Sequence, residues 1–209
     1  MAANGLAMTE QIHRGVFPQY QLHMVWPRRR LEAPPVVQLP AGYGMRTYRH
    51  GDESNFFRLM SMAGFDGWNE DTLLFWVKQI VPNGWFFVVE HKTGDLVATS
   101  MAMHHPAALH PFGGELAWVA GHPAHRGKAI GTSICAAVTG RLLGGGYERI
   151  YLKTDDWRLP ALKTYFNLGF VPFMYAPEMH ARWQEVCERL EWPFRPEEWN
   201  RETNGRVTP

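Results

Sequence analysis

A short segment rich in small and basic residues is the part of the sequence best suited to bind an anion. Residues 122–132 read HPAHRGKAIGT and lie between an expected strand and an amphipathic helix. Its small residues let the backbone turn tightly and approach a ligand. The first amides of a helix have no intrahelical acceptor and carry the positive end of its dipole. We therefore predict a phosphate-binding turn, to which Arg126 and Lys128 add charge suited to pyrophosphate or a 3′-phosphate.

This segment fits neither of the two common nucleotide motifs. It lacks the Gly-x-x-x-x-Gly-Lys-Ser/Thr pattern of a P-loop and the Gly-x-Gly-x-x-Gly pattern of dinucleotide-binding proteins. On these residues alone, a plain turn between a strand and a helix explains the segment equally well.

Histidine and cysteine give weaker signals. His104, His105 and His110 cluster in an expected loop, but without the spacing to carboxylate or cysteine partners that a metal site needs, so we expect no metal. Cys135 falls on the expected helix after the turn. No histidine stands at a position that suggests a base for activating its thiol, which favours a core residue over a nucleophile.

The elements around the turn predict an α/β fold with a mixed sheet and helices on both faces. Leu22, Met24 and Trp26 alternate with polar or smaller neighbours, which allows a short extra strand in an otherwise extended lead-in. The other expected strands are 42–48, 85–90, 96–103, 115–120, 149–154 and 170–175. Expected helices begin at Asp52 and near Asn69, the second burying positions up to Ile80, and others cover 130–143, 158–167 and the region around 183–190. The strand, helix and strand from 115 to 154 form a βαβ unit with parallel strands.

Length and composition indicate one globular domain. The chain has 209 residues, a net charge of +1 and 45% apolar residues. A charge this small gives no reason to expect a nucleic-acid or membrane surface. The start of the chain lacks a signal-peptide pattern, so we expect a cytoplasmic protein. We divide it into a lead-in (1–40), a main domain (41–176) and a helix with a polar tail packed on that domain (177–209).

Three stretches then resemble one family. Residues 126–131 resemble the Arg/Gln-x-x-Gly/Ala-x-Gly/Ala signature of the GNAT superfamily of acyl-CoA-dependent N-acyltransferases. Residues 161–170, ALKTYFNLGF, resemble its Ala-x-x-x-Tyr-x-x-x-Gly-Phe block, and residues 42–52 are similar to its first strand and helix start. The matches cover roughly residues 42–175 in the expected order.

The resemblance implies acetyl transfer from acetyl-CoA to a primary amine of a small molecule or peptide, by direct attack in a ternary complex. The residues implied to bind the cosubstrate are Val119, Ala120, Gly121, Arg126, Gly127, Lys128, Ala129, Ile130, Gly131, Thr132 and Arg158. Three of these depart from the family pattern. Ala129 replaces a glycine, which suits helical dihedral angles. Gly121 replaces a branched residue, which fits a bulge or a splay of the strands near the cofactor, and Arg158 replaces an asparagine.

Two side chains are implied to move protons. Tyr165 matches the family tyrosine that protonates the leaving thiolate, although a packing role is the alternative. Glu115 stands eleven positions before Arg126, similar to the general base of the histone-acetylating branch. Partial burial would raise its pKa and suit it to that role, and a solvated carboxylate without a role is the alternative.

The acceptor side is less defined. The loop holding Phe65, Asp66 and Trp68 joins the first two helices and is implied to shape the acceptor pocket, unless Trp68 only packs in the core. Other activities consistent with the sequence are transfer of a longer acyl group, CoA binding without catalysis, and nucleotide binding. An exposed sheet edge would allow a homodimer.

Overall fold

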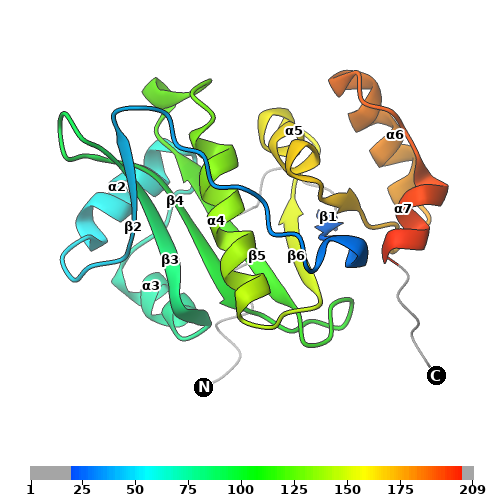
Figure 1. The fold of residues 1–209 in the computed structure, drawn as a ribbon, viewed down its shortest axis with the longest axis horizontal. Helices are drawn as coiled ribbons and strands as arrows, with labels where there is room; N and C mark the ends of the chain where they lie inside the picture. Colours follow the sequence, from blue (N-terminus) through cyan, green and yellow to red (C-terminus); the bar gives the residue numbers. More distant parts are fainter. Residues whose placement is uncertain (1–19, 204–209) are drawn as a thin grey trace.

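The computed structural model describes residues 20–203, which are built around a seven-stranded sheet in the order β2-β3-β4-β5-β6-β1-β7 (Figure 1). Every neighbouring pair is antiparallel except β5 and β6, which run parallel. The strands are β1 (Leu22–Val25), β2 (Tyr43–Thr47), β3 (Ile80–Glu90), β4 (Leu96–His104), β5 (Gly114–Gly121), β6 (Ile150–Thr154) and β7 (Val171–Pro172). This confirms the predicted mixed sheet and its parallel βαβ unit.

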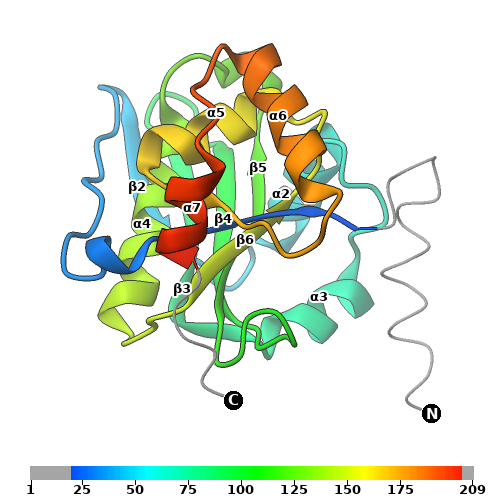
Figure 2. The same ribbon diagram turned by 90° about the vertical axis from the view of Figure 1, so that its right-hand side faces the viewer.

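Helices cover both faces of the sheet, as predicted. They are α2 (Glu53–Met62), α3 (Glu70–Val77), α4 (Ile130–Gly144), α5 (Leu159–Leu168), α6 (Met179–Leu190) and α7 (Pro196–Thr203), with short 3-10 turns η1 (Arg28–Arg30) and η2 (Pro123–His125). Figure 2 shows α4 on one side of the strands and α2 and α3 on the other. Two hydrophobic clusters fill the two interfaces, one beneath α4, α5 and α6 and one beneath α2 and α3.

The stripe predicted for α4 is buried throughout. Ile134, Val138 and Leu142 are all 0% exposed, and Ile130 is 5% exposed. Burying a side chain of this size contributes roughly 1.5–3 kcal/mol. These contacts fix the helix on the sheet and thereby fix the position of its N-terminus.

The strand predicted from Leu22, Met24 and Trp26 forms and lies inside the sheet. Met24 pairs with Leu152 of β6 on one side and with Pro172 of β7 on the other. The arginines of residues 28–30, which we expected to be extended, form η1 instead.

Four local predictions were wrong. Helix α3 ends at Val77, because the branched residues Ile80 and Val81 begin strand β3, which is therefore longer than the predicted 85–90. Strand β7 is limited to Val171–Pro172, since proline has no amide to extend the ladder. The predicted polar tail contains helix α7, whose Trp199 is 5% exposed.

The fourth concerns the start of α2. Asp52 occupies the N-cap position but makes no capping hydrogen bond. Its carboxylate instead accepts two hydrogen bonds from Arg46 of β2, at 2.6 and 2.8 Å, and one from the amide of Arg49. These bonds hold the pKa of Asp52 below its usual value. In contrast, Asn69, near which we expected the second helix to begin, caps α3 by accepting a hydrogen bond from the amide of Thr72.

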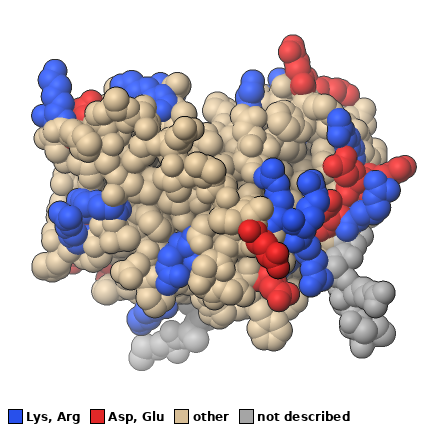
Figure 3. All heavy atoms as spheres, in the orientation of Figure 1, with Lys and Arg blue, Asp and Glu red and all other residues tan. Residues whose placement is uncertain are grey.

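The surface shows mixed charge on the face seen in Figure 3. Basic and acidic side chains lie side by side where Figure 1 places α6 and α7, and uncharged residues cover much of the remaining face. Within residues 20–203, the helices are too short or too polar to cross a bilayer.

Candidate functional site

The turn before α4 has the backbone shape of an anion-binding loop. Gly127 and Ala129 both have left-handed dihedral angles, with φ of 77° and 57°. Our expectation of helical angles at Ala129 was therefore wrong, and alanine in this region costs roughly 1 kcal/mol relative to glycine. The turn orients the start of the fifteen-residue helix α4 toward solvent.

The amides of this turn are free to bind a ligand. Within the described residues, none of the amides of residues 127–132 donates to a backbone oxygen. The first i→i−4 hydrogen bond at this end of α4 runs from the amide of Ser133 to the carbonyl of Ala129. A Cβ added to Gly127 or Gly131 would meet no atom within 4 Å. Open space, unpaired donors and the positive end of a helix dipole together suit a phosphate.

Polar side chains border this cradle. Lys128 Nζ donates to the hydroxyl of Tyr43 at 2.8 Å, and that hydroxyl lies 2.8 Å from Nδ1 of His125. Strand β2 thus holds the flank of the turn. The side chain of Arg126 is exposed and makes no hydrogen bond or ion pair with a described residue. Arg126 is therefore available to a bound anion.

Strands β5 and β6 part next to the cradle. They pair only at Gly114 with Ile150 and at Glu115 with Tyr151, so among residues 20–203 the later residues of β5 have no strand partner on that side. A bulge lies at Trp118, whose φ is 54° and which falls in the register shift opposite β4. We had expected a bulge or a splay at Gly121. Gly121 pairs regularly with Ala98 of β4, so the bulge is not there, but this end of β5 does diverge from β6.

The bulge gives the two faces of β5 different roles. Ala117 and Trp118 both join the cluster beneath α2 and α3, whereas Val119 joins the cluster beneath α4. A bulge places two consecutive side chains on one face in this way. Where β5 diverges from β6, the side chains of β5 thus face both the cradle side of the sheet and the side of α2 and α3.

Two hydroxyl groups lie on the cradle side without partners. Thr154 follows Leu152 on the same face of β6, and its Oγ1 is buried with no hydrogen-bond partner among the described residues. Tyr165 of α5 is 5% exposed, and its hydroxyl makes no hydrogen bond to a described residue. Burial raises the pKa of Tyr165 well above its usual value, so this phenol keeps its proton. Buried polar groups normally find partners, so both hydroxyls suit a polar ligand in the gap.

Glu115 lies on the opposite face and is more buried than we expected. Its carboxylate contacts His105 Nδ1, and it lies 3.3 Å from Lys153 Nζ and 3.2 Å from the hydroxyl of Tyr151. Burial alone would raise its pKa, but the hydrogen bond with His105 and the charge of Lys153 outweigh burial and lower it. The prediction of a raised pKa was therefore wrong.

The loop of Phe65, Asp66 and Trp68 forms part of an aromatic wall around Trp118. Phe65, Trp68 and Trp76 each meet the indole of Trp118 at steep angles, with ring centroids 5.9, 4.7 and 5.1 Å apart. Trp68 is only 9% exposed, which fits the packing alternative, while Asp66 is exposed and accepts from Ser61 at 3.3 Å.

Arg158 contacts this loop from the start of α5. Its guanidinium lies 4.4 Å from the ring centroid of Phe65 and pairs with Asp155 at 3.1 Å. It therefore joins the β6–α5 connection to the loop between α2 and α3. No contact between Arg158 and the turn of residues 126–131 is observed in the described part of the chain.

Sequence reasoning missed several members of the site. His105, Lys153, Tyr151 and Thr154 carry no motif. His105 reaches the site through the pairing of β4 with β5, and the other three reach it from β6, next to β5. Trp118 could have been found, because a large aromatic residue four positions before His122 stands at the end of the predicted strand.

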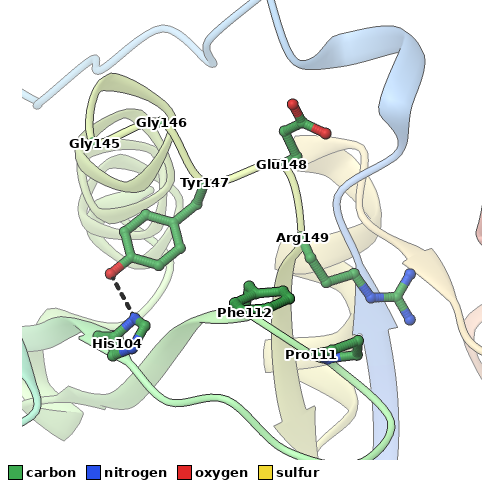
Figure 4. A pocket seen from close by; sticks show the side chains of 8 residues that line it. All are labelled: His104, Pro111, Phe112, Gly145, Gly146, Tyr147, Glu148 and Arg149. Carbon is green, nitrogen blue, oxygen red and sulfur yellow. Dashed lines mark hydrogen bonds between the residues drawn. The ribbon is translucent and has the colours of Figure 1, made fainter.

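A well-formed cavity lies elsewhere. A pocket of about 500 Å³ is found past the C-terminal end of α4, where the hydroxyl of Tyr147 meets His104 Nδ1 at 3.0 Å (Figure 4). Its lining includes Phe112, Gly145 and Arg149 and none of the predicted site residues. Because the cradle is at the other end of α4, this pocket is separate from it.

The remaining metal and thiol expectations concern residues that the structure describes. Between residues 20 and 203, no three His, Cys, Asp or Glu side chains are arranged to hold a metal ion. Cys135 is buried, and burial raises its pKa to about 12. A thiol in this state is a core residue, as predicted.

Comparisons with known proteins agree with this architecture. Residues 53–170, more than half of the chain, match the acetyltransferase (GNAT) family. A curated relative, mycothiol acetyltransferase from Saccharomonospora viridis, is 28% identical over 148 residues, which are 65% of this chain and 48% of that protein.

Solved structures share the fold. A GCN5-related N-acetyltransferase from Sphaerobacter thermophilus has a TM-score of 0.57 at 21% identity, over 81% of this chain and 53% of that one. A chain of the NatC complex, solved with Gag peptide and CoA, has a TM-score of 0.55 at 14% identity, over 66% of this chain and 92% of that one. The chain thus spans about half the length of the curated relative and of the Sphaerobacter structure.

Proposed function

Because this chain belongs to the acetyltransferase (GNAT) family, we propose that it transfers an acetyl group from acetyl-CoA to a primary amine of a small molecule or peptide, within a ternary complex. The observation that carries the proposal is the free amides before α4 beside the gap between β5 and β6. The free amides suit the diphosphate of the cosubstrate. The gap between the strands suits its extended pantetheine arm, which carries amide groups.

The cradle side would bind the cosubstrate. The amides of Gly127 to Thr132 and the side chain of Arg126 would hold the pyrophosphate, with Lys128 near it. The unpaired edge at Val119, Ala120 and Gly121 would bind the arm and polarise the thioester carbonyl, and Thr154 Oγ1 would supply a further polar contact. Held in this way, the acetyl group would lie in the gap between the strands, where positioning alone accounts for much of the rate.

The departing thiolate needs a proton, and Tyr165 is our candidate donor. Its hydroxyl is free, lies on the cradle side and remains protonated at neutral pH, because burial raises its pKa. A phenol is a weaker acid than a thiol in water, so complete transfer of its proton to the thiolate is uphill. The transfer is driven because the phenolate regains a proton from the nitrogen that becomes the amide.

The acceptor amine would approach from the side of α2 and α3. The aromatic wall at Phe65, Trp68 and Trp118 would exclude water from that approach, and the exposed carboxylate of Asp66 would attract an ammonium group. Arg158 would contribute by holding Phe65 in place, and its contact with the cosubstrate is also part of the proposal. Glu115 lies on this face, and we propose that it takes part in accepting the proton that the acceptor amine loses.

The test is release of free CoA thiol from acetyl-CoA with a panel of amines: 2-phenylethylamine, spermidine, glucosamine, a peptide with N-terminal alanine and a lysine peptide. We expect turnover with at least one of them. Propionyl-CoA and succinyl-CoA run in parallel separate acetyl transfer from transfer of a longer acyl group. Stabilisation by CoA without turnover of any amine would instead identify a non-catalytic CoA-binding domain, and competition by ATP would favour nucleotide binding.

A further inference from the structure

Glu115 does not itself reach the surface on the side of α2 and α3, from which the acceptor amine would approach. Its side chain is 7% exposed, and the imidazole of His105, with which it is in contact, is 27% exposed. A proton leaving an amine on that face would thus meet the imidazole before it meets the carboxylate. His105 follows directly after β4, and its amide donates to the carbonyl of Gly113 at 3.1 Å, which fixes its backbone beside β5.

The ring of His105 is oriented for proton transfer. Its Nδ1 faces Oε2 of Glu115, which is ionised and can only accept, so the proton of a neutral imidazole is on Nδ1. Nε2 then carries the free lone pair and has no hydrogen-bond partner among the described residues. A carboxylate that fixes the tautomer of an imidazole and stabilises its charged form is the arrangement that makes histidine an effective base.

The surrounding groups hold this pair in place. From β6, the hydroxyl of Tyr151 donates to the carbonyl of His105 at 2.6 Å, and Lys153 Nζ lies 3.3 Å from Oε1 of Glu115. From α3, Trp76 meets the imidazole edge to face with centroids 5.8 Å apart, and it is not titratable. Other titratable or charged neighbours are His104 in the chain and, behind Tyr151, His23 of β1 together with His110 and Arg149.

We propose that His105 is the catalytic base that takes the proton from the acceptor amine, and that Glu115 is a positioning residue that orients and stabilises its imidazole. The inference rests on the proposed acetyl transfer. It changes the role that the sequence suggested for Glu115 and assigns proton acceptance to a residue without any motif.

The proposed step balances as follows. The ammonium group gives one proton to Nε2 of His105, and the free amine attacks the thioester carbon. The N–C bond forms and the C–S bond breaks, and the thiolate takes the proton of Tyr165. The second proton lost by the nitrogen restores Tyr165, and the imidazolium releases its proton to solvent. The net products are the amide, CoA thiol and one proton.

Kinetics of the 209-residue chain test the proposal, with acetyl-CoA and the fastest amine of the panel. We expect His105→Gln to lower kcat by about 10²–10³-fold, with little change in KM for acetyl-CoA. The fall of kcat at low pH, the acidic limb of its pH profile, should be abolished in this variant. Glu115→Gln should retain that limb but move it to lower pH, because the imidazolium loses its counter-charge. Added imidazole should restore part of the kcat of His105→Ala.

The matched control is His104→Gln, which alters the neighbouring exposed histidine bonded to Tyr147 in the pocket of Figure 4. It should keep kcat within about twofold. Thermal unfolding with and without CoA shows whether each variant folds and binds. A His105→Gln variant that folds and keeps both kcat and the acidic limb would overturn the proposal.

A measurement without an acceptor separates this inference from the proposed function. Imidazole ¹⁵N shifts, assigned by comparison with His105→Gln, should show the proton of His105 on Nδ1 and should change in Glu115→Gln. Finding the proton on Nε2 would overturn the inference even if the enzyme is active. If the wild-type protein shows the expected tautomer but turns over none of the amines, the proposed acetyl transfer is wrong. The catalytic role of His105 is then wrong with it.

Discussion

At the residue scale, burial and pairing keep Tyr165 and Glu115 in complementary protonation states. Burial raises the pKa of Tyr165 above its usual value and outweighs the nearby positive charge of Arg158, which acts to lower it. The hydrogen bond with His105 and the charge of Lys153 keep the pKa of Glu115 below its usual value despite burial. One residue therefore holds a proton and the other lacks one at neutral pH, on the two faces of the sheet.

This state of Tyr165 leads to a direct prediction. Tyr165→Phe removes only the hydroxyl, so we expect kcat to fall by roughly 10²-fold or more with little change in KM for acetyl-CoA. The control is Tyr147→Phe, which removes a hydroxyl from the distant pocket of Figure 4. Steady-state kinetics with the fastest amine measure both. If the two variants behave alike, Tyr165 only packs between α5 and the sheet.

A second buried network joins β1 to the loop after β4. Arg149 Nε donates to Nδ1 of His110 at 3.1 Å, so the proton of a neutral His110 is on Nε2 and points to Nδ1 of His23, 2.8 Å away. Burial, with the nearby positive charges of Lys153 and Arg149, lowers the pKa of His23 to about 4 and that of His110 to about 2. Both imidazoles are thus neutral in the folded protein.

These lowered pKa values predict acid sensitivity. Between pH 6.5 and about 4 the unfolded chain binds protons that the folded chain does not, so the free energy of unfolding falls as pH falls. Each histidine contributes at most about 1.4 kcal/mol per pH unit in that window. Urea unfolding at pH 7.5, 6 and 5 should show this slope, and the double variant His23→Asn, His110→Asn should reduce it. His50→Asn, at a fully exposed site, is the control and should leave the slope unchanged.

At the element scale, the N-terminus of α4 lets ligand binding be separated from folding. A Cβ at Gly131 would meet no atom of the chain within 4 Å but would enter the space beside the free amides. Gly131→Val should therefore leave the melting temperature unchanged or slightly raised, because glycine is a poor helix former. It should also abolish the stabilisation by CoA, which is about 2.7 kcal/mol for the wild type at a hundredfold excess over Kd.

Gly140→Val is the matched control for that prediction. Gly140 lies in the same helix, and an added Cβ there also meets no atom within 4 Å. It should keep the full thermal shift with CoA. Equal shifts for the two valine variants would mean that CoA does not use the start of α4.

The elements that could be predicted are those whose sequence pattern agrees with their packing. The period of Ile130, Ile134, Val138 and Leu142 identified α4 because a single face is buried. The tail was different: α7 is polar on average, and only Trp199 and Thr203 are buried, so the sequence carries too few apolar positions to show a period. Similarly, Ala129 gave no sign of its left-handed dihedral angles, because alanine rarely adopts them.

The site divides in the same way. The cradle is local in sequence, so residues 126–132 could be predicted from their order and types. The surroundings of Glu115 are not local, since His105, Tyr151 and Lys153 reach it from β4 and β6. Whether a carboxylate is buried and paired depends on these distant residues, and for that reason the direction of its pKa shift could not be read from the strand that carries it.

At the scale of the whole molecule, strand β1 makes the N-terminal segment part of the sheet. It lies between β6 and β7, pairs with both, and places His23 beside His110. The cluster beneath α4, α5 and α6 includes Leu22, Met24 and Trp26. The face that carries the cradle and Tyr165 therefore depends on residues far ahead of it in the chain.

This dependence separates an integral strand from a dispensable lead-in. Met24 is 0% exposed, so Met24→Asp would bury an unpaired charge or force the strand out of the sheet, at a cost of about 3 kcal/mol or more. Val36 is 81% exposed in the same N-terminal region, and Val36→Asp should change the free energy of unfolding by less than about 0.5 kcal/mol. Urea unfolding measures both, and CoA binding by the Met24 variant should weaken in parallel, because β1 supports the strand that carries Thr154. If the two variants are equally stable, β1 contributes little to the sheet, and the cradle is held by α4 and β5 alone.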